Sequence, residues 1–162
     1  MKTLYLVRHA KSSWEFDLTD HERPLNDRGL RDAPRVAAHV AAHMEKPDLI
    51  ISSDAMRAKT TAFFFAKAFS IDENDIVLNH KLYDFNGGQL VQEIRACDAS
   101  VSCLMVFGHN NAMTSVVNTY GDRYTDNVPT SGFTAICFDT ENWADISQGK
   151  TIFSCTPKEL RP

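Results

Sequence analysis

The sequence has few of the features that mark membrane, secreted or nucleic-acid-binding proteins. No apolar run approaches the length of about 20 residues that a membrane-spanning helix needs, and the apolar stretch after Met1 is too short for a secretory leader. There are 17 Lys and Arg against 21 Asp and Glu, a formal net charge of -4, so no overall positive field attracts nucleic acid or an anionic membrane. We therefore expect a cytoplasmic protein in which any anion site is a local pocket.

Cysteine, glycine and proline are also scarce. The four cysteines, Cys97, Cys103, Cys137 and Cys155, lie far apart and include no CxxC pair, which argues against a disulfide framework or a cysteine-ligated zinc site. Only 7 Gly and 6 Pro occur in 162 residues, of which 43% are hydrophobic. This composition predicts one compact domain over residues 1–162, and a monomer is the default because no exposed apolar stripe is evident.

Apolar runs alternate along the chain with segments of helical periodicity. Strand-like runs occur at 3–7, 48–53, 76–78, 103–107, 133–138 and 151–155. Helical patterns occur at 30–44, 55–69, 87–97 and 112–120. This order predicts an α/β fold, a three-layer α/β/α sandwich with a mainly parallel central sheet.

Two helix starts can be predicted from capping residues. Asn26 or Asp27 is suited to cap the first helix, but Pro34 lacks the N–H of a helix interior, so we expect a late start or a kink there. The second helix is expected to be capped by Ser53 or Asp54.

Cationic and imidazole side chains follow three of the predicted strands. Arg8 and His9 follow the first strand, Arg57 comes shortly after the second, and His109 and Asn110 follow the run at 103–107. Ligands of open α/β sheets bind beyond the carboxyl ends of the strands, so these groups are expected to converge in one cleft.

Such a cleft suits phosphoryl transfer. Guanidinium groups bind phosphate oxygens bidentately and stay charged at all working pH values. A neutral imidazole can attack phosphorus through one nitrogen while a backbone carbonyl holds the other, and a second imidazole can stabilise the transferring group. The arrangement needs no metal and no cofactor.

Four motifs, each after or near a predicted strand, resemble those of one family. They are LVRHAKSSW at 6–14, RPLNDRG at 23–29, SSDAMRA at 52–58 and FGHNN at 107–111. Together they resemble the histidine phosphatase superfamily, the phosphoglycerate mutase-like proteins. The short chain, the KSSW continuation, LYD at 82–84, TSG at 130–132 and the closing PKEL resemble its small branch of SixA-like phosphohistidine phosphatases.

The resemblance implies a role for each matching residue. His9 is expected to be the nucleophile that becomes phosphorylated, and Arg8 and Arg57 to clamp the phosphate. His109 is expected to contact the transferring group, and Arg23 to add a further phosphate contact. Hydrolysis then has two steps, transfer to His9 and attack of water on the phosphohistidine.

Other positions depart from the family pattern or leave their role open. Ala10 replaces the usual glycine, and Asp54 and Asn111 stand where prolines are common in the family. Asn110 is a candidate phosphate ligand. Asp84 is the one carboxylate that position nominates as a general acid, with a loop-capping role as the alternative. Without an acid, phosphohistidine is a better substrate than an alkyl phosphate, because its P–N bond is labile.

The expected substrate is a phosphorylated protein histidine or a small phosphorylated metabolite. The alternatives are a small-molecule phosphomonoesterase of the same superfamily, a mutase, and a non-catalytic phosphate-binding module. A mutase needs additional chain to retain a bisphosphate, and a non-catalytic module would normally lose a reacting group. Lys11 and Trp14 are candidates for the pocket rim, with a solvated loop as the alternative.

The other four histidines carry weaker signals. His39 and His43 lie four apart on a helix, as zinc ligands can, but no Glu follows the first and no third ligand is apparent, so a polar helix flank is the preferred interpretation. His21 and His80 are interpreted as loop residues, with His21 near the mouth of the pocket because Arg23 is close.

Overall fold

The structure, a computed structural model, describes residues 1–162. Its strands are β1 (Lys2–Arg8), β2 (Leu49–Ser52), β3 (Val77–Leu78), β4 (Cys103–Gly108), β5 (Phe133–Phe138) and β6 (Lys150–Cys155). Its α-helices are α1 (Asp27–His43), α2 (Met56–Ala68), α3 (Gly88–Arg95), α4 (Ala112–Tyr120) and α5 (Pro157–Leu160). Short 3-10 turns are η1 (Asp20–Glu22), η2 (Glu73–Asp75), η3 (His80–Leu82) and η4 (Trp143–Asp145).

The six strands form one sheet in the order β3-β2-β4-β1-β5-β6. The pairings of β1 with β4, β4 with β2 and β2 with β3 are parallel. Along the chain, the segments that connect β1 to β2, β2 to β3 and β3 to β4 each contain a helix. β5 is antiparallel to both β1 and β6. The predicted mainly parallel sheet is therefore confirmed, with an antiparallel pair at its C-terminal edge.

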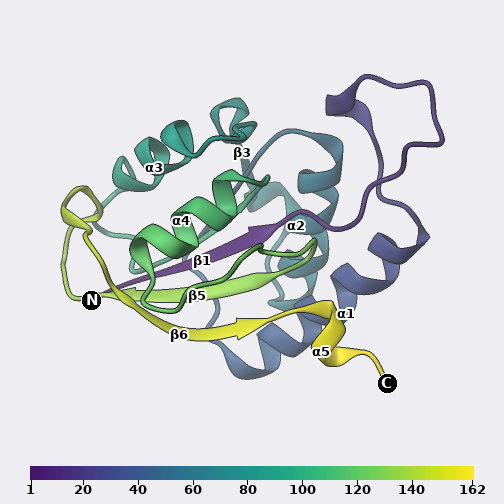
Figure 1. The fold of residues 1–162 in the computed structure, drawn as a ribbon. Coiled ribbons are helices and arrows are strands. Elements are labelled where there is room, and N and C mark those ends of the chain that lie inside the picture. Colours follow the sequence, from purple (N-terminus) through teal and green to yellow (C-terminus); the bar gives the residue numbers. More distant parts are fainter.

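Apolar side chains pack on both faces of the sheet. Figure 1 shows the resulting arrangement of helices on both sides of the strands. Leu4 and Leu6 of β1 belong to the core beneath α3 and α4, whereas Tyr5 and Val7 belong to the core beneath α1 and α2. This alternation follows from the two-residue period of a strand, and burial on both faces explains the continuous apolar run. The predicted α/β/α sandwich is confirmed.

The start of α1 follows the cap predicted from Asn26. The Asn26 side chain accepts a hydrogen bond from the Gly29 N–H at 2.8 Å, and the helix continues through Pro34, so the predicted late start is wrong. At Gly29 a Cβ atom would lie 2.2 Å from the Lys11 carbonyl oxygen. The glycine of the RPLNDRG motif therefore allows α1 to pack against the chain that follows β1.

The start of α2 differs from the prediction. The helix begins at Met56 with Ala55 in the N-cap position, and the Ala55 N–H donates to the Ser53 hydroxyl at 3.2 Å. The Asp54 carboxylate makes no bond to the helix and contacts His21 and His80 instead. The prediction that Ser53 or Asp54 is the N-cap of α2 is therefore wrong, because Ala55 occupies that position.

The carboxyl ends of β1, β4 and β2 meet at one edge of the sheet. Arg8 lies beside Gly108, and Ser52 lies beside Phe107. β5 is antiparallel, so it begins at this same edge, with Phe133 beside Val7. The chain after β1 extends beyond the sheet as the purple loop of Figure 1, which contains η1. Segments distant in sequence are thus gathered at one end of the sheet. None of the helices is both long and apolar enough to cross a membrane.

Candidate active site

His9 immediately follows β1 and is 7% exposed. Its Nδ1 lies 2.7 Å from the Ala10 carbonyl oxygen, which can only accept a hydrogen bond, so Nδ1 bears the proton. The lone pair of the neutral ring is then on Nε2, which accepts from Arg57 Nε at 3.4 Å. The Ala10 N–H donates to Thr61 Oγ1 at 2.9 Å, so the backbone that orients the ring is itself fixed by α2.

His109 follows β4 and lies behind His9, with the two ring centroids 5.2 Å apart. It is 1% exposed, and the rings of Tyr83 and Phe85 cover it at 5.3 and 5.1 Å. Its Nε2 is 2.8 Å from the Ser53 hydroxyl, whereas its Nδ1 is buried without a partner. The two histidines therefore come from neighbouring strands and lie side by side.

Both rings are held neutral by their surroundings. Burial lowers the pKa of His9 to about 3, and the positive charges of Arg57 and Arg8 oppose its protonation further. Burial also lowers the pKa of His109 to about 2, with His9 and Arg57 adding to the effect. A neutral His9 keeps its Nε2 lone pair available at every physiological pH.

Three arginines surround the exposed edge of His9. Arg8, Arg23 and Arg57 line one cavity of about 320 Å³ together with His9, Lys11, Ser12, Trp14, Asp20, Phe85 and Thr130. Arg8 donates through one terminal nitrogen to the Val128 carbonyl at 2.8 Å, and its buried Nε has no partner. Lys11 and Trp14 thus line the cavity, as the rim interpretation expected. His109 is not among the residues that line the cavity and lies directly behind His9.

Arg23 is oriented by the chain on both sides of it. Its Nη1 donates to Ser12 Oγ at 2.8 Å and to the Ser13 carbonyl at 3.2 Å. The Trp14 ring stacks on its guanidinium, with 3.4 Å between the guanidinium carbon and the ring centroid. These contacts fix the guanidinium plane, which favours directional binding of an anion.

Asp20 lies among these arginines and was not predicted from the sequence. Its carboxylate accepts from Arg57 Nη2 at 2.9 Å and from Arg23 Nε at 3.1 Å, and the Tyr83 hydroxyl donates to it as well. Its backbone carbonyl accepts from Arg57 Nη1 at 2.6 Å. Burial opposes ionisation of Asp20, but hydrogen bonds from Tyr83 and Arg57 outweigh it and hold the pKa of Asp20 below its ordinary value. Asp20 thus occupies guanidinium donors that an incoming anion needs.

One sequence signal could have indicated Asp20. It precedes Arg23 by three positions, a spacing that places the two on one side of a helical turn, and η1 forms that turn. Its contacts with Arg57 and Tyr83 span 37 and 63 residues, and no local pattern predicts them.

Two candidate residues have other contacts. The Asp84 carboxylate accepts from the backbone N–H groups of Asn86, Gly87 and Leu90, so it caps the turn before α3 as the loop-capping alternative describes. The Asn110 side chain contacts Thr114 and Asn127. Neither Asp84 nor Asn110 lines the cavity around His9.

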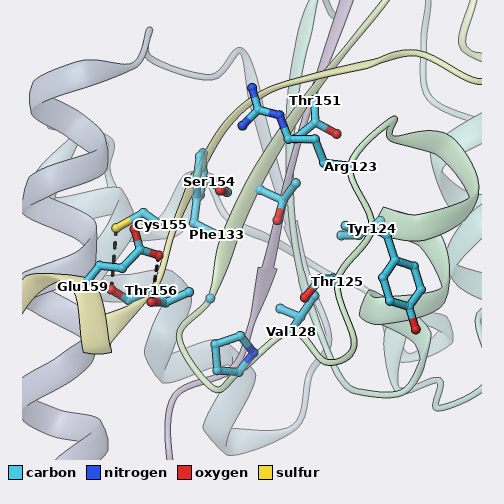
Figure 2. Close-up of a pocket in the computed structure, with 14 residues that line it drawn as sticks. Arg123, Tyr124, Thr125, Val128, Phe133, Thr151, Ser154, Cys155, Thr156 and Glu159 are labelled. Carbon is cyan, nitrogen blue, oxygen red and sulfur yellow. Dashed lines mark hydrogen bonds between the residues drawn. The ribbon is translucent and has the colours of Figure 1, made fainter.

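A second cavity, of about 290 Å³, lies against β5 and β6 (Figure 2). Arg123 and Tyr124 line one side of it, and Thr156 and Glu159 line the other. Its lining contains no histidine, one arginine and one glutamate. Three guanidinium groups and an imidazole therefore occur together only in the cavity around His9 and not in this second one.

Comparison with known proteins assigns the family. A model of the histidine phosphatase superfamily (branch 1) matches residues 4–99, more than half of the 162 residues. The chain belongs to the histidine phosphatase superfamily. An uncharacterized protein of Mycobacterium tuberculosis is 29% identical over 153 residues, which is 88% of this chain and 93% of the relative. An uncharacterized chloroplastic protein of Arabidopsis thaliana is 46% identical over 61 residues, 37% of this chain and 28% of the relative.

Solved structures share the fold over almost the whole chain. A candidate phosphohistidine phosphatase SixA from Agrobacterium tumefaciens superposes with a TM-score of 0.79 at 28% identity, covering 96% of this chain and 98% of that one. The protein histidine phosphatase SixA complexed with tungstate has a TM-score of 0.82 at 16% identity, covering 98% and 99%. The resemblance to the SixA-like branch is therefore confirmed.

Proposed function

We propose that the protein is a metal-independent phosphatase that forms a phosphohistidine on His9, with protein-borne phosphohistidine as its substrate. The observation on which this rests is the tautomer of His9. Because Nδ1 donates to the Ala10 carbonyl, the lone pair of the ring is on Nε2, where its one contact is a long hydrogen bond of 3.4 Å from Arg57, in a cavity with three guanidinium groups. The tungstate complex of a SixA protein of similar fold is consistent with this, because tungstate, like phosphate, is a tetrahedral anion.

Two buried nitrogens near His9 that have no hydrogen-bond partner support binding of an oxyanion. Arg8 Nε and His109 Nδ1 are buried and have no hydrogen-bond partner. If the Ser53 hydroxyl donates to His109 Nε2, the proton of the neutral ring is on Nδ1, which can then donate to a phosphoryl oxygen. Buried polar groups are nearly always paired, so such donors indicate a ligand. In this proposal Arg8 and Arg57 clamp the phosphoryl group and His109 stabilises it during transfer.

Phosphohistidine fits the groups at the cavity. Asp84 is bound to backbone amides, so no acid comes from that position. An imidazole leaving group takes a proton from solvent and needs little help. The exposed faces of Trp14 and Phe85, 77% and 46% exposed, offer an aromatic rim to a protein-borne ring.

A small-molecule phosphomonoesterase is the second candidate, and Asp20 is the observation that favours it. The Asp20 carboxyl lies in the cavity beside Arg57 and the Tyr83 hydroxyl. Once a phosphate dianion takes the guanidinium donors, the Asp20 carboxylate loses hydrogen bonds that lower its pKa, takes up a proton from solvent and can pass that proton to the ester oxygen of the leaving group. This candidate predicts efficient hydrolysis of alkyl phosphates, whereas the first predicts a strong preference for phosphohistidine.

The test compares phosphate release from a phosphohistidine protein and from a chromogenic ester. We expect His9→Ala to lower turnover at least about 10⁴-fold while the circular dichroism spectrum stays unchanged. Phosphate from a labelled substrate should be trapped on the wild-type enzyme as acid-labile phosphohistidine. The control is His43→Ala, since His43 is exposed at the far end of α1. Full activity of His9→Ala would refute the mechanism, and a catalytically inert wild type would favour a non-catalytic binding module.

A further inference from the structure

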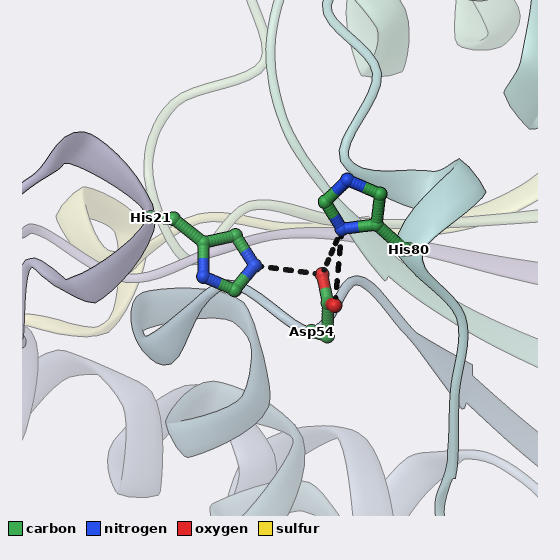
Figure 3. A group of neighbouring side chains, drawn as sticks. All are labelled: His21, Asp54 and His80. Carbon is green, nitrogen blue, oxygen red and sulfur yellow. Dashed lines mark hydrogen bonds and ion pairs between the residues drawn. The ribbon is translucent and has the colours of Figure 1, made fainter.

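A second group of histidines lies outside the phosphate cavity and takes no part in the proposed mechanism. His21 comes from η1, Asp54 from the connection between β2 and α2, and His80 from η3 (Figure 3). His21 Nε2 is 2.8 Å from Asp54 Oδ1, and His80 Nδ1 is 3.0 Å from both oxygens of the same carboxylate. Three segments that are distant in sequence thus bring two imidazole nitrogens and a carboxylate oxygen, all potential metal ligands, close together.

The Asp54 carboxylate has no structural partner other than these rings. It precedes α2, where a carboxylate often caps the helix, but no side chain caps this helix. No arginine or lysine pairs with Asp54, and all its hydrogen bonds are to His21 and His80. The carboxylate is therefore placed for the two imidazoles and not for the helix.

Two imidazoles and a carboxylate form a donor set for a zinc-class cation. Imidazole nitrogen suits Zn²⁺, Fe²⁺ and Ni²⁺, and sites with three protein ligands leave a coordination position open for solvent. The ligand atoms lie within 4.8 Å of one another. Zinc–ligand lengths of about 2.1 Å place tetrahedral ligands about 3.4 Å apart, so small side-chain rotations complete the geometry. The side chains are 36%, 32% and 72% exposed for His21, Asp54 and His80, so an ion can reach them.

We propose that His21, Asp54 and His80 form a binding site for a divalent cation of the zinc class beside the phosphate cavity. The site uses none of the groups assigned to phosphoryl transfer, so it goes beyond the proposed function and does not depend on it.

The position of this site gives it a structural consequence. His21 directly follows Asp20, and His80 lies in the same short turn that leads to Tyr83. Asp20 and Tyr83 are hydrogen-bonded to each other at the edge of the cavity. A cation bound to both imidazoles would therefore tie η1 to η3 next to the Asp20 carboxylate.

The test measures metal binding directly. Metal-free protein is titrated with Zn²⁺ in competition with a chromophoric chelator at neutral pH, and with Co²⁺ to record the visible absorption of a nitrogen- and oxygen-ligated site. We expect one equivalent of Zn²⁺ to bind, and His80→Ala and Asp54→Asn each to weaken binding at least about 10-fold. His80 is mostly exposed and Asp54→Asn is isosteric, so both variants should fold.

The matched control is the double variant His39→Ala/His43→Ala, which removes the other surface histidine pair, with ring centroids 4.3 Å apart. It should leave the zinc affinity unchanged, as should His9→Ala. Absence of zinc binding would overturn the proposal, and so would affinity that survives His80→Ala and Asp54→Asn or that is lost in either control. Because no substrate is present, failure of this test is distinct from absence of phosphatase activity.

Discussion

His9 and His109, the inner pair of histidines, contrast with His21 and His80, the outer pair. The inner rings are 7% and 1% exposed, and no carboxylate bonds to either of them. The outer rings lie at the surface and share Asp54. Burial near arginines keeps an imidazole neutral and nucleophilic, whereas exposed imidazoles that share a carboxylate offer their nitrogens to a cation. The same side chain thus has two chemistries, which the surroundings select.

The largest effect is expected when the imidazole of His109, the second histidine of the inner pair, is removed. His109→Ala should lower kcat about 10²- to 10³-fold on a phosphohistidine substrate, because it deletes one donor to the transferring phosphoryl group. The measurement is steady-state phosphate release, with His43→Ala as the control. If His109 is only a packing residue beneath Phe85, KM and kcat will change little while the melting temperature falls, which would contradict the assignment.

The neutrality of the inner pair can be tested through the pH dependence of stability. In the unfolded chain both histidines take up protons near their ordinary pKa of about 6.5, whereas the folded values of about 3 and about 2 prevent uptake. The unfolded state then binds more protons, so the free energy of unfolding falls as pH drops below about 6.5.

Each inner histidine should contribute roughly 2 kcal/mol to the loss of stability between pH 7 and pH 5. Urea unfolding at the two pH values measures the difference. In His9→Gln the loss of unfolding free energy between pH 7 and pH 5 should be smaller by about the contribution of one histidine. In His43→Gln this loss should be the same as in the wild type. An identical pH dependence in wild type and His9→Gln would show that His9 is not kept neutral by the fold.

The smallest effect is expected at Asp20, whose carboxylate accepts hydrogen bonds from the guanidinium groups of Arg57 and Arg23. Asp20→Asn should strengthen inhibition by inorganic phosphate about threefold to tenfold, because Arg57 and Arg23 lose a competing anion. Asp17→Asn, on the same exposed loop, is the matched control.

The same variant separates the two candidate substrates. If Asp20 only competes with phosphate, its loss should not slow phosphohistidine hydrolysis. If Asp20 is the acid for an ester leaving group, kcat on alkyl phosphates should fall about 10²-fold or more. Weaker phosphate inhibition in Asp20→Asn would contradict the competition and assign Asp20 a supporting role in anion binding.

Much of the fold and part of the site could be predicted from local patterns. The run at 3–7 predicts a doubly buried strand, and the strand ends predict that Arg8, His9, Arg57 and His109 meet at one edge. The structure brings these four together. The prediction did not place Asp20 among them, and it named Ser53 or Asp54 as the N-cap of a helix whose N-cap position is occupied by Ala55.

The alternation of strands and helices, and the positions at which cationic groups leave the sheet, can be read from the amino-acid sequence alone. These are properties of neighbouring residues, because side-chain period and strand ends are local. Tertiary structure alone decided which carboxylate meets which cation: Asp20 the arginines, Asp54 the outer histidines and Asp84 the backbone of the turn before α3. The physical reason is that a carboxylate pairs through space over about 3 Å, and loop conformations, not sequence distance, bring its partners within that reach.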